Sequence, residues 1–120
     1  MDYIFDNERP IYIQLVEKVE REIVSGIIKP GERLPSVREL ALIVKVNPNT
    51  VQKSLVELEN KALIYTERTN GKFVTQNQKL IEKMKKELAK EKVNNYLNDM
   101  KNIGISFEEA IAYLQELGGK

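Results

Sequence analysis

The fold of this chain is decided by residues 31–74, GERLPSVRELALIVKVNPNTVQKSLVELENKALIYTERTNGKFV. Within this stretch, Asn47 is a favourable N-cap because its side-chain oxygen can accept a hydrogen bond from a free N–H at a helix start. Pro48 follows at the first helical position, where its missing N–H is not needed and its fixed φ suits a helix. The pattern therefore predicts a helix that begins at residue 48.

This helix is expected to bury one side and to present polar groups at its leading end. Its apolar residues recur at helical spacing, which predicts a buried stripe of Val51, Leu55, Leu58 and Ala62. The polar residues at the leading end are Asn49, Thr50, Gln52 and Lys53. Asn and Gln can pair with adenine in the major groove, Thr can bond a base edge or a phosphate, and Lys adds positive charge. The same pattern would also arise if these residues only favoured a helix start and bound nothing. The neighbouring segments are needed to choose between the two interpretations.

A second short helix is predicted just upstream. Ser36 followed three residues later by Glu39 forms a capping box. The buried face of this helix is predicted to consist of Val37, Leu40, Ala41 and Val44. Arg38 points to the other side. Two short helices joined by a tight corner, the second with a polar leading end, are typical of a helix-turn-helix.

A β-hairpin is predicted directly after the second helix of this pair. Residues 63–68 are β-prone, Thr69-Asn70-Gly71 is a turn, and residues 72–75 return. A hairpin in this position is a wing. Its basic and polar residues are placed to enter the adjacent minor groove or to bind phosphates.

Together these motifs resemble the winged helix-turn-helix domain of GntR-type bacterial transcriptional regulators. The resemblance rests on GERLPSVRELA at 31–41, on Asn49-Thr50-Val51, on Leu63-Ile64 and on Gly71-Lys72-Phe73-Val74, and it covers roughly residues 10 to 75. PIYIQL at 10–15 and a short helical tail are similar to the YtrA-type subfamily in particular. The resemblance implies a mainly α protein with a small β-hairpin wing, in which a winged helix-turn-helix is followed by a two-helix dimerisation tail.

The resemblance also implies which residues contact DNA. The expected set is Ser36, Arg38, Asn47, Asn49, Thr50, Gln52, Lys53, Arg68, Thr69, Asn70, Gly71 and Lys72. There are departures from the family pattern: Ser54 and Ala62 stand where the family usually has Ala and Gly, and Thr69 and Lys72 replace the usual Gly and Thr of the wing. Pro48 and Gln52 stand where some relatives carry Arg, so the base preference of those relatives does not transfer to this chain.

The composition excludes several function classes. The chain has 120 residues, enough for one compact domain plus an appendage, and contains no Cys and no His. Disulfides, Cys/His zinc sites, Ser-His-Asp triads and imidazole pH switches are therefore excluded. No cofactor, metal site or enzymatic nucleophile-base pair is predicted. The absence of a long apolar run and of a signal peptide indicates a cytoplasmic protein without a membrane partner.

Charge bears on the DNA interpretation in two ways. The net charge of +1 is low for a nucleic-acid-binding module, which is often strongly basic. Positions 33–53, however, hold Arg33, Arg38, Lys45 and Lys53 against Glu39 alone. The helix-turn-helix is therefore locally positive, and local charge is what meets the phosphates.

The segments before the helix-turn-helix are expected to support it. Residues 3–5 form a short apolar segment that would pack as a strand or against a partner subunit. A first helix follows, with its apolar stripe on Tyr12, Leu15, Val16, Val19 and Ile23, and it closes at Ser25-Gly26. Lys29-Pro30-Gly31-Glu32 has the form of a type II turn, with Gly at the position that requires positive φ.

The division into domains is predicted at residue 75, with a winged helix-turn-helix over 1–75 and a helical tail over 76–120. A long helix is expected from about Gln78 to Asn102, ended by Gly104, and Ser106 with Glu109 forms a capping box that opens a last helix. The first half of the long helix carries Leu80, Ile81, Met84 and Leu88 on one face, and the second half carries its apolar residues on another. The last helix is expected to bury Phe107, Ala110, Ile111, Leu114 and Leu117.

A tail of this size cannot easily bury two such faces alone, which implies a second copy of the chain. The expected homodimer interface consists of Val93, Tyr96, Leu97, Met100, Ile103, Phe107, Ile111 and Leu114. The alternative is that the two-helix hairpin folds back over its own wing domain. The tail is too short to enclose a small-molecule pocket within one subunit, so an effector would sit at an interface.

The function expected from these features is a homodimeric DNA-binding regulator, a repressor rather than an activator, acting on an inverted-repeat operator in double-stranded DNA. The YtrA-type resemblance further implies control of an operon for a membrane transporter. The rival hypothesis is a winged-helix protein-interaction or adaptor module that has lost DNA binding. Overall neutrality favours the rival, while Arg38, Thr50 and Gln52 argue against it.

Overall fold

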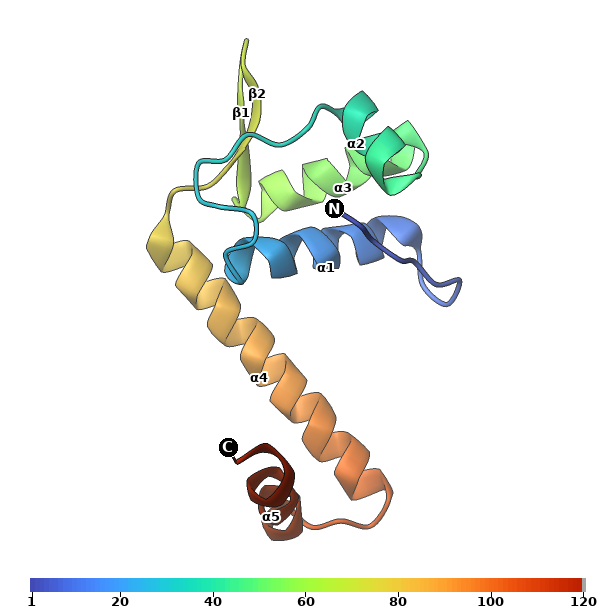
Figure 1. Cartoon of the computed structure of the whole chain (residues 1–120), viewed down its shortest axis with the longest axis vertical. Coiled ribbons are helices and arrows are strands. Elements are labelled where there is room, and N and C mark those ends of the chain that lie inside the picture. The colour runs from blue at the N-terminus through green and yellow to red at the C-terminus, as the bar shows by residue number, and fades with distance from the viewer. Residues whose placement is uncertain (120) are drawn as a thin grey trace. The chain divides into compact units, whose positions relative to one another are not determined.

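The computed structural model describes residues 1–119, which form five helices and a two-stranded antiparallel sheet (Figure 1). The elements are α1 Ile11–Val24, α2 Val37–Val44, α3 Pro48–Asn60, β1 Ile64–Glu67, β2 Gly71–Val74, α4 Gln78–Asn102 and α5 Phe107–Gly118. They belong to two compact units, of which the first covers Met1–Lys83 and the second begins at Met84. The predicted mainly α fold with a hairpin wing is confirmed.

The first unit is built around the apolar sides of α1, α2 and α3. Its fully or almost fully buried side chains include Leu15, Val19, Ile23, Leu40, Val51, Leu55, Leu58, Leu63 and Val74. Those that belong to α1, α2 and α3 recur at helical spacing in the sequence, which places them on one side of each helix, as predicted. At the far end of α3, Lys61 Nζ lies 2.8 Å from Oε1 of the buried Glu20 on α1. This pair satisfies a carboxylate that would otherwise be buried alone.

The wing is joined to the segment that precedes α2. In the hairpin, Ile64 pairs with Val74 and Glu67 with Gly71, and an isolated antiparallel bridge joins Arg33 to Phe73. Leu34 N donates to Lys72 O at 2.8 Å, and Val74 N donates to Glu32 O at 2.9 Å. The chain that leads into the helix-turn-helix therefore lies along β2 as a short third edge.

The turn before this edge forms as expected. Gly31 has φ +78°, the left-handed conformation that the third position of a type II turn requires, and Glu32 N donates to Lys29 O at 3.0 Å.

The N-terminal arm is held on α1 by a buried amide that the sequence pattern did not single out. Gln14 is 3% exposed, and its Nε2 donates to Asp6 O at 3.0 Å and to Arg9 O at 2.8 Å. Its Oε1 accepts from Asp6 N at 3.0 Å. Residues 3–5 form no strand; instead the Tyr3 hydroxyl donates to Glu22 of α1.

The second unit is a helical hairpin made by the later part of α4 and by α5. Gly104, with φ +84°, ends the first helix, and the predicted capping box of Ser106 and Glu109 opens the second. The Tyr96 hydroxyl of α4 donates to Ala110 O of α5 at 2.7 Å. Ala110 is the one buried residue of α5 among those described, so the expectation that α5 buries four more apolar residues is not met within one chain.

One residue of the predicted α3 stripe was misplaced. Ala62 is exposed, because α3 ends at Asn60 and Lys61 caps it, so Ala62 lies beyond the helix with φ +60°. It occupies the left-handed position that follows a helix end, where glycine is favoured. Within residues 1–119, no helix is long and apolar enough to cross a bilayer.

Candidate nucleic-acid interface

The leading end of α3 carries the polar side chains that were predicted to face DNA. The side chain of Asn47 caps the helix by accepting from Asn49 N at 2.8 Å. Asn49, Gln52 and Lys53 are exposed, and Thr50 is half-buried. Because these residues share the first turn and a half of one helix, the structure brings them together on one end of α3.

A buried serine fixes α3 against α1 directly behind this end. Ser54 is fully buried, and its hydroxyl lies 3.0 Å from Tyr12 O and 3.1 Å from Thr50 O. The contact to Tyr12 ties the leading end of α3 to the backbone of the neighbouring helix. In the sequence this residue stood out only as a small departure from the family pattern, so its positioning role was missed.

Lys53 rests on an aromatic ring of α1. Its Nζ lies 3.8 Å from the centroid of the Tyr12 ring, which is within the range of a cation–π interaction. The ring orients the ammonium group without neutralising it, so the charge stays available to a phosphate. Tyr12 was predicted only as part of the apolar stripe of α1, on which it is half-buried.

At the start of α2, the capping box occupies the polar groups of Ser36. Glu39 N donates to Ser36 Oγ at 3.1 Å, and Ser36 N donates to Glu39 Oε1 at 3.0 Å. The hydrogen bonds from Ser36, chiefly that of its backbone N–H, lower the pKa of the Glu39 carboxyl. Arg38 is exposed beside them, and no carboxylate of residues 1–119 pairs with it within 4 Å.

The wing divides its predicted contact residues into two groups. Arg68 and Thr69 are exposed at the tip, where the Asn70 side chain donates to Glu67 Oε2 at 3.1 Å. Gly71 has φ +103° and begins β2. Lys72 points instead to the far end of α3.

Lys72 is already engaged within the molecule. Its Nζ forms an ion pair with Glu59 Oε1 and lies 2.9 Å from Thr66 Oγ1, and Thr66 Oγ1 in turn donates to Glu59 at 2.9 Å. The hydrogen bond from Lys72 is the main cause that lowers the pKa of the Glu59 carboxyl. The cluster fastens the wing to α3, so a phosphate contact by Lys72 would compete with Glu59.

Arg33 is a basic residue near the wing that was predicted only as part of the local charge. Its Nε donates to Asn70 O at 2.8 Å, across 37 positions of sequence. No sequence signal marks this contact, because it depends on the bridge between Arg33 and Phe73.

Comparisons with known proteins agree with this arrangement. Residues 11–74 match the family described as bacterial regulatory proteins, gntR family. The chain is 38% identical over 118 residues to the HTH-type transcriptional repressor YtrA of Bacillus subtilis strain 168, covering 92% of this chain and 90% of YtrA. A GntR family transcriptional regulator from Listeria monocytogenes has a TM-score of 0.87 and 40% identity, covering 94% of this chain and 99% of that one.

The structure of AraR(DBD) in complex with operator ORX1 is also similar. It is 27% identical with a TM-score of 0.55, and the match covers 60% of this chain and 93% of that one.

The fold and the match to this family define a winged helix-turn-helix regulator of transcription rather than an enzyme. The chain belongs to the gntR family of bacterial regulatory proteins, and the predicted likeness to YtrA is confirmed.

Proposed function

We propose that this chain acts in the cytoplasm as a homodimer that binds double-stranded DNA and represses transcription from an inverted-repeat operator. The observation that carries the proposal is the exposed leading end of α3. Asn49, Gln52 and Lys53 face solvent there, while Val51 and Leu55 of the same helix are buried. A helix held in this way can enter the major groove and present its amide side chains to base edges.

The proposed contacts differ in their roles. Base discrimination is assigned to Arg38, Asn49, Thr50 and Gln52, which combine bidentate donors with short polar groups. Affinity without base preference is assigned to Ser36, Asn47, Lys53 and the wing residues Arg68, Thr69, Asn70, Gly71 and Lys72. Among these, Lys53 and Arg68 are exposed cations that form no ion pair within residues 1–119.

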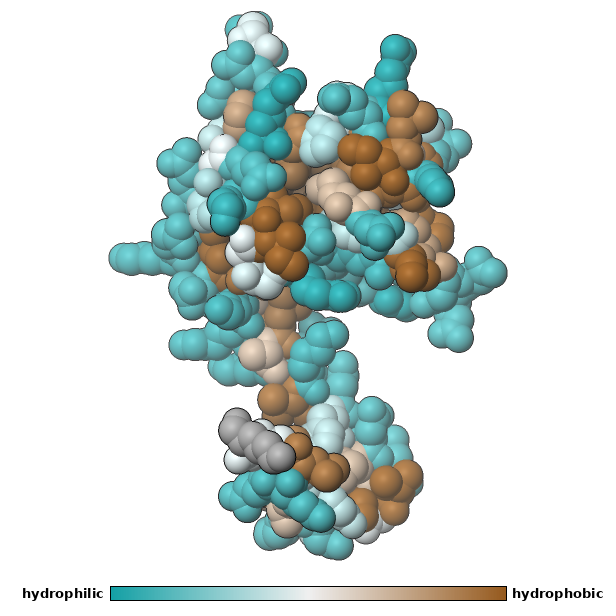
Figure 2. Space-filling model, viewed as in Figure 1, coloured by the Kyte–Doolittle hydropathy of each residue, from teal (hydrophilic) through white to brown (hydrophobic). Residues whose placement is uncertain are grey.

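The dimer proposal rests on unpartnered apolar surface in the second unit, where apolar residues reach the outside (Figure 2). Ile103 is 73% exposed, Phe107 59% and Leu114 52%. Exposed apolar side chains gathered on one small unit are typical of an interaction site. The full proposed interface is Val93, Tyr96, Leu97, Met100, Ile103, Phe107, Ile111 and Leu114.

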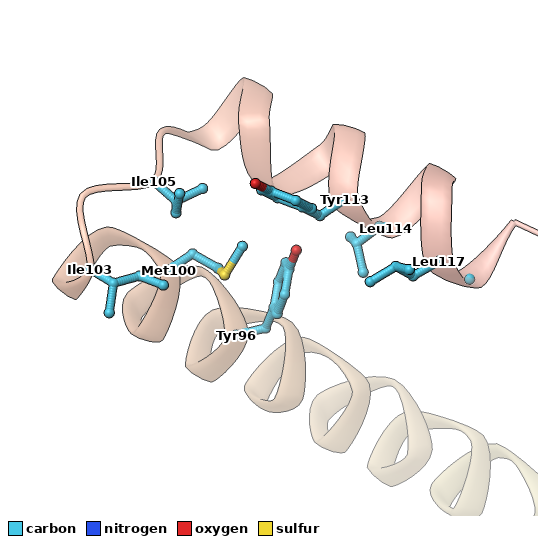
Figure 3. Close-up of a pocket in the computed structure, with 8 residues that line it drawn as sticks. Tyr96, Met100, Ile103, Ile105, Tyr113, Leu114 and Leu117 are labelled. Carbon is cyan, nitrogen blue, oxygen red and sulfur yellow. The ribbon is translucent and has the colours of Figure 1, made fainter.

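An apolar groove between the two helices of this unit adds to that surface. It has a volume of about 510 Å³, and Tyr96, Met100, Tyr113 and Leu114 point toward one another across it (Figure 3). The hairpin of a second chain can fill this groove and complete a four-helix arrangement with two-fold symmetry. A two-fold axis relates two α3 helices as inverted copies, which matches an inverted repeat, whose half-sites are read in major grooves about 34 Å apart.

The named functions of relatives support the proposal. YtrA of Bacillus subtilis is named a transcriptional repressor, and AraR(DBD) was solved in complex with an operator. Control of a transporter operon rests on the YtrA-type resemblance alone, and transcript levels after deletion of the gene would test it.

Selection of bound duplexes from a random pool tests the proposed function. The selected duplexes should share an inverted repeat. If about eight phosphates are neutralised per dimer, a plot of log affinity against log salt concentration should have a slope near −7. A gel shift with the protein's own upstream DNA separates this proposal from the adaptor hypothesis. Absence of any enriched motif and of any shifted duplex would overturn the proposal and favour the adaptor.

A further inference from the structure

The guanidinium group of Arg33 is held against the tip of the wing. Arg33 Nε donates to Asn70 O at 2.8 Å. A Cβ added at Gly71 would lie 3.2 Å from Nε and 3.4 Å from Nη2 of Arg33, so the guanidinium packs closely against the backbone at Gly71. The backbone of Arg33 is fixed as well, because it bridges to Phe73 of β2.

This fixed cation has no partner of opposite charge at close range. No carboxylate oxygen of residues 1–119 lies within 4 Å of its nitrogen atoms. Glu39 is near enough for Arg33 to contribute to the lowered pKa of its carboxyl, but that carboxyl accepts its hydrogen bond from Ser36. Arg33 is exposed, and within residues 1–119 its side chain donates a single hydrogen bond, through Nε.

Lys72, a cation of the wing, does have a partner of opposite charge. Its ammonium group is bound to Glu59 and Thr66, and its side chain is 20% exposed. Lys72 and Arg33 thus differ: Lys72 is neutralised inside the molecule, whereas Arg33 is oriented by a hydrogen bond and forms no ion pair within residues 1–119.

We infer that Arg33 is a further phosphate-binding residue, beside the wing, with Nε fixed by Asn70 O and the Nη groups presented to the DNA backbone. A planar guanidinium whose orientation is already set loses little entropy on forming paired hydrogen bonds to a phosphate. The contact adds affinity and carries no base preference. The inference rests on the proposed function, since it assigns one contact within the same complex.

The test is a fluorescence anisotropy titration with a duplex selected from the random pool and with a scrambled duplex, at salt from about 50 to 200 mM. We expect R33Q to lose affinity for both duplexes alike, by about threefold to tenfold at the lowest salt. The salt slope should shrink by about 0.9 per bound subunit. R33K keeps the charge, so it should recover the slope while its affinity stays between those of R33Q and the unchanged protein.

The matched control is R21Q, which removes the same charge from an exposed position of α1. It should leave the salt slope and the affinity unchanged, and circular dichroism melts of all variants report whether they fold. A folded R33Q with unchanged affinity and slope would overturn the inference while the proposed function stands. A parent protein that binds neither duplex would overturn both.

Discussion

Lys53 Nζ lies 3.8 Å from the centroid of the Tyr12 ring, so a cation at the leading end of α3 is seated on an aromatic side chain of α1. We expect a double-mutant cycle of Tyr12→Leu and Lys53→Met to give a coupling energy of about 0.5–1 kcal/mol in the free energy of unfolding. Urea denaturation of the four proteins measures it. Tyr12→Phe keeps the ring and should behave like the parent; a coupling energy near zero would contradict the interaction.

Gln52→Ala should relax the base preference at one position of each half-site. The amide of Gln52 is exposed on α3 and can pair bidentately with adenine, so its loss should cost about 1–3 kcal/mol of discrimination. Selection of bound duplexes measures the preference. Asn60→Ala removes an amide from the other end of the same helix and should leave the motif unchanged, whereas Lys53→Ala should weaken all sequences alike. An unaltered motif for Gln52→Ala would refute the assignment.

Ala62→Gly should stabilise the protein by about 0.5–1 kcal/mol. Ala62 has φ +60°, which strains any residue that carries a Cβ, and it lies outside the helix, so no helical propensity is lost. Thermal or urea denaturation measures the change. Ala89 is an exposed residue in the middle of α4, where glycine is a poor helix former. Ala89→Gly should therefore destabilise the protein by up to about 1 kcal/mol. If both substitutions destabilise, the strain at position 62 is refuted.

Leu114→Asp should dissociate the proposed dimer. A carboxylate at this half-exposed position of the α4–α5 groove would have to be desolvated in the interface, so the dissociation constant should rise at least about 30-fold. Sedimentation over a concentration series measures it. Ile27→Asp alters an isoleucine of the first unit that is 67% exposed, and it should leave the association intact. A parent protein that sediments as a monomer at micromolar concentration would rule out the dimer.

Glu59→Gln should make the free energy of unfolding depend less on pH in the acid range. Lys72 lowers the pKa of Glu59 in the folded protein, so the folded state binds a proton less readily there than the unfolded chain does. The stabilisation is therefore present above the ordinary pKa of about 4.3 and is lost as pH falls through the lower folded value. Melting temperatures across this range should fall less steeply for Glu59→Gln. If the melting temperatures of the parent and of Glu59→Gln depend on pH in the same way, the ion pair with Lys72 contributes nothing to stability.

The features that the sequence predicted correctly are those encoded by neighbouring residues. Asn47 and Pro48 mark the start of α3, and Ser36 with Glu39 marks the start of α2, because each signal acts within one helical turn. Positive φ at Gly31 follows in the same way from a four-residue turn. Such patterns can be interpreted without knowing what packs against them.

The features that were missed join distant segments. Arg33 meets Asn70 across 37 positions and Ser54 meets Tyr12 across 42, so neither contact has a local pattern. Lys72 was predicted to contact DNA as part of the wing, but its partner Glu59 belongs to another element. Ion pairs between distant segments decide which charged side chains stay available for a ligand. The periodicity of the sequence does not predict such pairs.

The hydrogen bonds of Gln14 hold the N-terminal arm, residues 1–9, on α1. The amide hydrogen of Asp6 is bound to Gln14 Oε1, and the buried side chain also holds the carbonyl groups of Asp6 and Arg9. Releasing the arm would break all three of these hydrogen bonds, so detachment is resisted although the arm has no regular secondary structure. Amide exchange at Asp6 should accordingly be slow for a coil segment, and a Gln14→Leu substitution should loosen residues 6–9 while Tyr3 still donates to Glu22.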